Sequence, residues 1–284
     1  MGMTLCHPRG PSEAPGDAHL PTASGLRWRL MSELPGSVRL ALWVTAAWNG
    51  EVSLRAALAR SFPDVDHVAG DLGRLDVWRD LGERALFVAL PRPGDLSRMP
   101  LCSPPAAALA AEAGECVFVP SVGGLLVPTL TEFGPSGDTG WRVDWSAHDA
   151  QPVPRHRLEM IELRDVERTL VSRLREHTEA FERVGGSPWG TSARAEAEAA
   201  LETRLWGLPD DTPGKALRVM SLAATAGVLA ERARRLTSLG SDGLDLGTSA
   251  RRESLVRSLA AAADDALADA TNVAVMSLAG WRRA

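Results

Sequence analysis

The sequence predicts an α+β protein: a small, mostly antiparallel sheet unit with helices, followed by an all-α antiparallel helical bundle. Two observations support this prediction. Short apolar or alternating runs that end at Pro or Gly, a pattern typical of strands, all lie before residue 150. After residue 157 the apolar residues recur in steps of three and four, as on one face of a helix, and prolines stand only at expected helix boundaries.

This pattern divides the chain into three segments. Residues 1–30 are rich in Pro, Gly and Ser and have no periodicity, so we expect a disordered N-terminal extension there. Met31 opens the periodic sequence and is a candidate for the true translation start. Residues 31–150 are expected to form an α+β domain, and residues 157–284 a helical bundle domain. The chain is long enough for two domains of ordinary size.

The α+β domain is expected to contain about four strands and three short helices. Gly123 and Gly124 separate two of the strands and predict a hairpin turn. Ser37 is expected to cap the first helix. Residues 63–80 are acidic and dense in turn-forming residues, so we expect a loop there. The expected strands are 85–90, 116–119, 125–131 and 141–146, and the expected helices are 38–48, 53–61 and 106–113.

The bundle domain is expected to contain four helices. The first has a single apolar stripe, so a Leu174→Asp substitution is expected to unfold the bundle. His177 fills one gap in that stripe and is expected to be a packed residue with one hydrogen bond. The third helix begins with Thr212 as its cap and is apolar all round from 216 to 230, which is typical of a buried centre. The expected helices are 158–184, 192–206, 213–237 and 250–281.

Charge and cysteine content argue against several classes of function. The formal net charge is −5 and neither half is basic, so nucleic-acid binding is not expected. The three cysteines form no CxxC pair, which disfavours a disulfide framework or a zinc site and fits a reducing cytoplasm. The apolar stretches are too short to span a bilayer, so no membrane partner is expected. The sequence implies no cofactor.

One acidic segment supports a metal-site hypothesis. Asp64, Asp66 and His67, with Asp71 and Asp76 further along, bring carboxylates and an imidazole into one predicted loop. Such groups could hold a divalent cation. Their spacing matches no established site, and Asp is common in turns because it bonds its own backbone. A solvated acidic loop is therefore the alternative.

Two other kinds of site have candidate residues. Cys102 or Cys116 could act as a nucleophile with His148 or His156 as its base. A buried, inert thiol is the simpler interpretation of Cys116. Trp189 stands among glycines and a proline between two expected helices. It either closes the end of the bundle or is an exposed anchor for a partner.

The motifs of common nucleotide-binding and hydrolytic sites are missing from the sequence. Lys215 follows a glycine, but the upstream glycine of a phosphate loop is at the wrong spacing, and Ser121 lacks the first glycine of a nucleophile elbow. We therefore expect a non-catalytic interaction or regulatory protein that acts through the helical bundle, with a protein partner or as a homodimer. The alternative is an enzyme or small-molecule-binding protein with a pocket between the sheet unit and the bundle.

Overall fold

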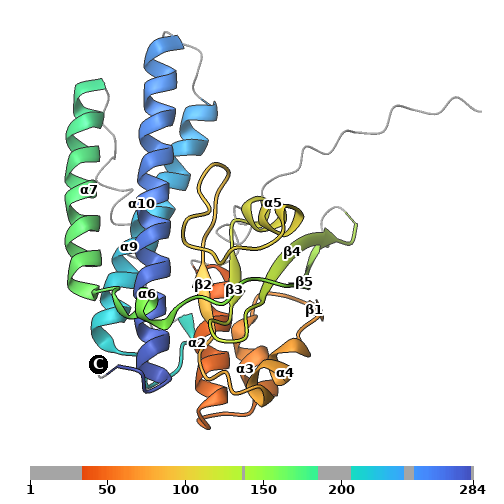
Figure 1. Cartoon of the computed structure of the whole chain (residues 1–284). Coiled ribbons are helices and arrows are strands. Elements are labelled where there is room, and N and C mark those ends of the chain that lie inside the picture. Colours follow the sequence, from red (N-terminus) through yellow and green to blue (C-terminus); the bar gives the residue numbers. More distant parts are fainter. Residues whose placement is uncertain (1–33, 136–137, 185–205, 240–245, 283–284) are drawn as a thin grey trace, which may run out of the picture.

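A sheet unit and a set of long helices form the two parts of the molecule (Figure 1). The computed structural model describes residues 34–135, 138–184, 206–239 and 246–282. Within these ranges the first part contains a mixed sheet with short helices, and the second part contains helices alone. The α+β class predicted from the sequence is confirmed. The predicted N-terminal extension, residues 1–30, lies outside the described residues.

The sheet has five described strands in the order β1-β5-β4-β3-β2. β1 runs parallel to β5, and the other neighbouring pairs are antiparallel. The longest pair is in register from Leu125 opposite His148 to Phe133 opposite Gly140. Four strands match the prediction, whereas β1 lies in the predicted loop. The strands are β1 (His67–Gly70), β2 (Phe87–Ala89), β3 (Cys116–Phe118), β4 (Leu125–Phe133) and β5 (Gly140–His148).

The prediction of a loop over residues 63–80 is wrong, because β1 and the helix α4 lie there. The polar residues that suggested a loop fasten the two ends of the strand. Asp66 Oδ2 accepts a hydrogen bond from the backbone N–H of Trp141 at 2.8 Å, and Asp71 Oδ2 accepts one from Ala147 at 2.9 Å. These carboxylates extend the pairing of β1 with β5 beyond the backbone ladder.

Four short helices pack around the sheet. The predicted cap of α2 is wrong, because Pro35 takes the N-cap position. The backbone N–H of Ser37 donates instead to the buried carboxylate of Glu115 at 2.8 Å. Ser53 caps α3 by accepting a hydrogen bond from the backbone of Ala56. The helices are α2 (Gly36–Trp48), α3 (Leu54–Ser61), α4 (Arg74–Asp80) and α5 (Pro104–Ala113).

The predicted helix 158–184 is interrupted near its start, so its N-terminal part is wrong. Leu158 is buried at the end of one helix. The carbonyl of Glu162 then accepts the backbone N–H of Asp165 at 2.9 Å and begins a second helix. The break turns the chain from the sheet unit into the long helices (Figure 1). The two helices are α6 (Arg155–Glu159) and α7 (Leu163–Val184).

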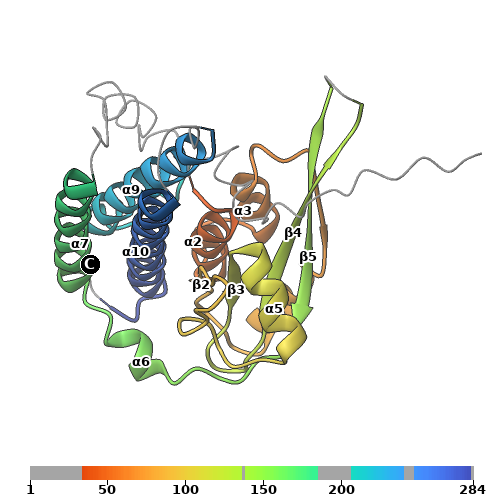
Figure 2. The same ribbon diagram turned by 90° about the horizontal axis from the view of Figure 1, so that it is seen from above.

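Two more long helices complete the described part of the bundle. α10 lies between α7 and α9 on one side and α2 with β2 on the other (Figure 2). Thr212 donates its hydroxyl to the carbonyl of Pro209 at 2.7 Å in place of the predicted capping bond. The predicted helix 192–206 lies outside the described residues except for Trp206. No described helix is long and apolar enough to cross a membrane. The helices are α9 (Gly214–Leu239) and α10 (Leu246–Leu278).

One hydrophobic core joins the two parts of the chain. It contains Phe87 and Phe118 from the sheet together with Val275 from α10. Asn272 of α10 makes the most specific link: its side-chain amide accepts the N–H of Val88 and donates to the carbonyl of the same residue, both at 2.9 Å. This side chain therefore pairs the outer edge of β2 as a neighbouring strand would.

Candidate functional site

A cavity of about 880 Å³ lies where the two parts of the chain meet. We call it the junction cavity. Its walls are the loop 96–101, the segment 151–162 and the start of α7, and its floor is the α10 segment 262–272. This volume is sufficient for a small organic molecule or for side chains of a protein partner. The cavity lies between the sheet unit and the bundle, as the alternative interpretation of the sequence requires.

Four charged side chains form a network at the floor of the junction cavity. Arg92 donates to Asp265 at 2.8 Å, and the Nε of Arg98 lies 3.3 Å from the same carboxylate. Arg98 also pairs with Asp269, one turn further along α10. The arginines come from the loop after β2 and the aspartates from α10, so the network fastens one wall of the cavity to its floor.

Asp269 is strongly perturbed within this network. Its side chain is only 14% exposed, and burial raises its pKa from 3.8 to about 6, although the nearby Arg98 guanidinium acts in the opposite direction. The negative charge of Asp265 raises this pKa further. An ionised Asp269 is therefore incompletely compensated by the arginine that it contacts.

The rim of the junction cavity exposes large apolar side chains. Leu101 and Met160 are 72% and 75% exposed, and Leu96 is 38% exposed. These are three of the eight large apolar side chains that the described surface exposes. They come from two distant segments of the chain and gather around one hollow. Clustering of this kind differs from the scattered exposure of single apolar residues that is normal on protein surfaces.

The predicted metal ligands have other partners. Asp64 lies 3.3 Å from the guanidinium of the buried Arg39, and Asp66 bonds the backbone of β5 as described above. The ring centroids of His67 and Phe133 are 5.1 Å apart. In the described ranges no group of three or more His, Cys, Asp or Glu is arranged to hold a metal ion. The metal site of Asp64, Asp66 and His67 stays a prediction that these contacts do not support.

The two described cysteines lie in surroundings that disfavour a thiolate. Cys116 is fully buried in β3, and burial raises the pKa of its thiol. Burial also raises the pKa of the half-buried Cys102. His148 is in β5, separated from β3 by β4, and its Nε2 lies 3.0 Å from Ser146 Oγ. His156 is exposed on α6. Because the thiolate is the nucleophile, these surroundings do not favour thiol catalysis.

The two bundle residues singled out from the sequence have different outcomes. Trp189 lies outside the described residues. His177 is buried, as expected. Its Nε2 has no hydrogen-bond partner among the described residues, so this atom does not form the expected hydrogen bond. Burial and the neighbouring Arg173 lower the pKa of His177. This histidine lines a second cavity, between α7 and α9.

Family comparison matches both parts of the chain. The N-terminal domain of Rv1486c-like proteins matches residues 37–159, and the C-terminal domain matches residues 164–268. The chain belongs to the Rv1486c-like family. Searches of curated proteins and of solved structures give no match. The boundary between the two matched domains of this Rv1486c-like chain includes Met160, so the junction cavity lies where the two family domains meet.

The charged residues of the junction cavity in this Rv1486c-like chain do not follow from sequence reasoning. Arg98 stands in a proline-rich stretch, and its partner Asp269 is 171 residues away. Nothing local connects the two. A signal was present on α10, because Asp265 and Asp269 are one helical turn apart in a stretch that is otherwise mostly alanine. Such a pair predicts a charged face, but it does not reveal which loop meets that face.

Proposed function

We propose that this Rv1486c-like chain is a non-catalytic interaction or regulatory protein that binds a protein partner at the junction cavity and the adjoining surfaces of α7 and α10. The observation that carries the proposal is the rim, where Leu96, Leu101 and Met160 expose apolar surface around one hollow. Binding energy at interfaces concentrates where a large side chain of one partner fills a pocket of the other. A partner that inserts one aromatic or aliphatic side chain would cover this rim.

The lining of the junction cavity supports binding more than catalysis. Most enzymes need a nucleophile or a base beside the reacting group. The described residues that line this cavity include neither His nor Cys, and both floor aspartates, Asp265 and Asp269, are paired with arginine. Large apolar side chains exposed around one hollow are typical of a recognition surface.

A small-molecule ligand is the second candidate for the same cavity. Its support is the cavity volume of about 880 Å³, which lies in the range of drug-sized ligand sites. The two candidates differ in what they need. A small ligand would depend on the space above α10, whereas a protein partner would depend on the exposed rim.

We also infer that the protein acts in the cytoplasm. The support is chemical, because free cysteines such as Cys102 and Cys116 suit a reducing compartment. A second copy of the chain is one of the protein partners to be considered.

A peptide-display selection tests the protein-partner proposal. Wild-type protein is used as bait, and every selected peptide is then tested against a Leu101→Ser/Met160→Ser variant. We expect the tightest peptides to carry a large apolar residue and to bind the double variant at least tenfold more weakly, a difference of about 1.4 kcal/mol. Isothermal titration measures both affinities. A Leu81→Ser variant is the matched control, because Leu81 is 62% exposed at the end of α4 and does not line the cavity.

Two outcomes count against this proposal. If no selected peptide distinguishes wild type from the rim variant, the rim does not bind peptides. If a fragment screen by thermal shift finds small molecules whose effect is abolished by Ala262→Phe but kept in the rim variant, the cavity is a small-molecule site. Ala262 lines the floor, and a phenyl group there would fill the space without changing the rim.

A further inference from the structure

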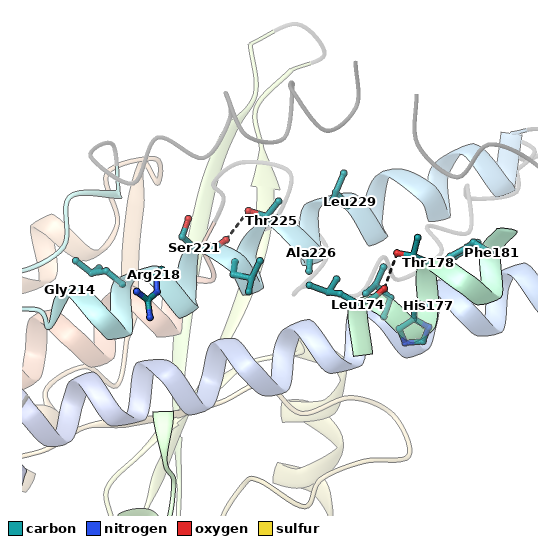
Figure 3. A pocket seen from close by; sticks show the side chains of 13 residues that line it. Leu174, His177, Thr178, Phe181, Gly214, Arg218, Ser221, Thr225, Ala226 and Leu229 are labelled. Atoms are coloured by element: carbon teal, nitrogen blue, oxygen red, sulfur yellow. Dashed lines mark hydrogen bonds between the residues drawn. The ribbon is translucent and has the colours of Figure 1, made fainter. Parts of the chain in front are cut away.

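A second cavity, of about 750 Å³, lies between α7 and α9 and is also lined by Leu259 of α10. We call it the bundle groove; Figure 3 shows side chains of both helices around it. Its lining is mostly apolar. The hydroxyls of Thr178 and Thr225 donate to carbonyls of their own helices, at 2.9 and 2.8 Å. These two hydroxyls therefore need no ligand. The large apolar side chains of the groove are Leu174, Phe181, Leu217, Leu222, Leu229 and Leu259.

The groove leaves one side of α9 uncovered in the described part of the chain. α9 was predicted to be apolar all round, and its Val219, Ala223 and Ala230 are indeed buried. Leu222 and Leu229 are only half-buried and face the groove. α7 and α9 each pack on α10 and touch each other much less. Three helices thus leave an apolar face that a fourth could cover.

The direction of the chain identifies what can cover it. α7 and α9 run parallel, because Glu167 near the start of α7 pairs with Arg218 near the start of α9 at 3.3 Å (Figure 1). Consecutive helices that run parallel need a connection that returns along their full length. The chain leaves α7 at Val184 and is fixed again at Trp206, which is buried beside the start of α9. Gly207 confirms this anchoring, because its carbonyl accepts a hydrogen bond from the indole of Trp43 at 2.8 Å.

The length and pattern of the connecting sequence fit the groove. The predicted helix 192–206 would be about 22 Å long, and the groove-lining part of α9, from Gly214 to Leu229, has the same length of about 22 Å. Apolar residues recur in steps of four along the predicted helix, and Glu196, Glu198 and Glu202 lie outside this stripe, whereas Arg194 and Arg204 fall within it. Small alanine side chains allow close packing against neighbouring helices. The apolar positions are Ala193, Ala197, Leu201 and Leu205.

We propose that residues 192–205 of the same chain occupy the bundle groove and complete an up-down-up-down four-helix bundle. Their apolar positions would cover Leu222 and Leu229, and the three glutamates of the segment would face solvent. This inference concerns the groove alone and does not depend on the function proposed for the junction cavity.

Disulfide trapping tests the proposed occupant directly. A Thr225→Cys change in the groove is combined with Ala197→Cys, and mild oxidation is followed by peptide mapping. We expect an intramolecular 197–225 disulfide that forms at least tenfold faster than in the control pair. The control combines Ala197→Cys with Ala262→Cys, because residue 262 lines the junction cavity and not the groove. Equal rates for the two pairs would overturn the proposal, and a disulfide that links two molecules would show that a second copy occupies the groove.

Limited proteolysis gives a readout that requires no disulfide. Trypsin is expected to cleave after Arg194 and Arg204 at least tenfold more slowly in the intact protein than in a synthetic peptide of residues 188–208. A Leu222→Asp variant that retains the wild-type circular dichroism should lose this protection, whereas Leu81→Asp should keep it. Cleavage of the wild-type protein at the rate of the peptide would overturn the proposal.

Discussion

The junction cavity and the bundle groove are similar in volume but differ in where their apolar side chains lie. The floor of the junction cavity carries paired charges, Asp265 and Asp269 with their arginines, and its apolar side chains stand at the rim. The bundle groove has an apolar floor, including Leu222 and Leu229, and the two threonine hydroxyls described above are bonded within their own helices. The ion pairs hold the junction floor together without a bound ligand. An apolar floor between helices is stabilised by permanent cover.

A cavity between two packed parts is not by itself a functional site. We propose that a partner binds reversibly at the apolar rim above the paired charges. The apolar strip along two parallel helices is instead proposed to be covered by a segment of the same chain. α7 contributes to both cavities, with Leu170 on the junction side and Leu174 on the groove side. Substitutions on this one helix therefore separate the two cases.

Replacing Leu170 should give the largest effect. Leu170 is 1% exposed and belongs to the main core, so Leu170→Asp would bury a carboxylate without a partner. We expect a loss of about 4 kcal/mol in the free energy of unfolding, measured by urea denaturation. Leu174→Asp, one turn further along, should lose about 2 kcal/mol if residues 192–205 cover the groove. A loss below about 0.5 kcal/mol at Leu174 would be typical of an open surface and would contradict the proposed cover.

Replacing Asn272 should have the next largest effect. Asn272→Leu would leave the N–H and carbonyl of Val88 buried without partners, which costs about 1–3 kcal/mol for each group. We expect a total loss of about 2–4 kcal/mol in urea denaturation. Thr271→Val is the matched control, because the hydroxyl of Thr271 bonds only a carbonyl of its own helix. Its loss should stay below about 1 kcal/mol. Equal losses in the two variants would mean that the edge of β2 does not depend on Asn272.

The pH dependence of stability should reveal the buried carboxylate of Asp269 at the floor of the junction cavity. Asp269 has a pKa raised from 3.8 to about 6, so the folded protein binds its proton more tightly than the unfolded chain does. Its contribution to stability is therefore fully present below pH 3.8 and is lost as the pH rises to about 6, by up to about 3 kcal/mol. Asp269→Asn should remove this dependence of stability on pH. At pH 7.5 the free energy of unfolding of this variant should be at least equal to that of wild type.

Arg98→Met provides the counterpart to this measurement. Removing the guanidinium takes away the positive charge that holds the pKa of Asp269 down, so the loss of stability should extend to higher pH than in wild type. Urea denaturation between pH 4 and pH 8 measures both slopes. If wild type and Asp269→Asn show the same slope between pH 4 and pH 6, the burial of this carboxylate is not the cause of a pH effect.

Much of the fold could be predicted because it depends on local patterns. Alternation and proline boundaries predict four of the strands, and the steps of three and four predict α7, α9 and α10 to within a few residues at most ends. The errors occur where a distant group decides the local structure. β1 forms because Asp66 and Asp71 bond the backbone of β5, some 75 residues later in the chain. A single sequence does not show such a pairing.

The candidate site could be predicted only in its position. A pocket between the sheet unit and the bundle follows from having two packed parts, but its residues come from three separate segments and from Phe118 of β3. The pairing of Arg98 with Asp269 joins residues 171 positions apart. The metal hypothesis stays a prediction, but its Asp64 and Asp66 are close in sequence and yet bond different parts of the protein. Proximity in sequence is a weak guide to ligand sets when carboxylates have backbone or arginine partners nearby.

The smallest effect on the free energy of unfolding is expected at the rim of the junction cavity. Leu101 and Met160 are 72% and 75% exposed, so replacing both by Ser should change the free energy of unfolding by less than about 0.5 kcal/mol. The same variant is expected to lose peptide binding. A stability loss above about 1 kcal/mol in urea denaturation would mean that the folded chain already covers these side chains. The rim would then resemble the bundle groove, and the distinction between an exchangeable and a permanently filled cavity would fail at this site.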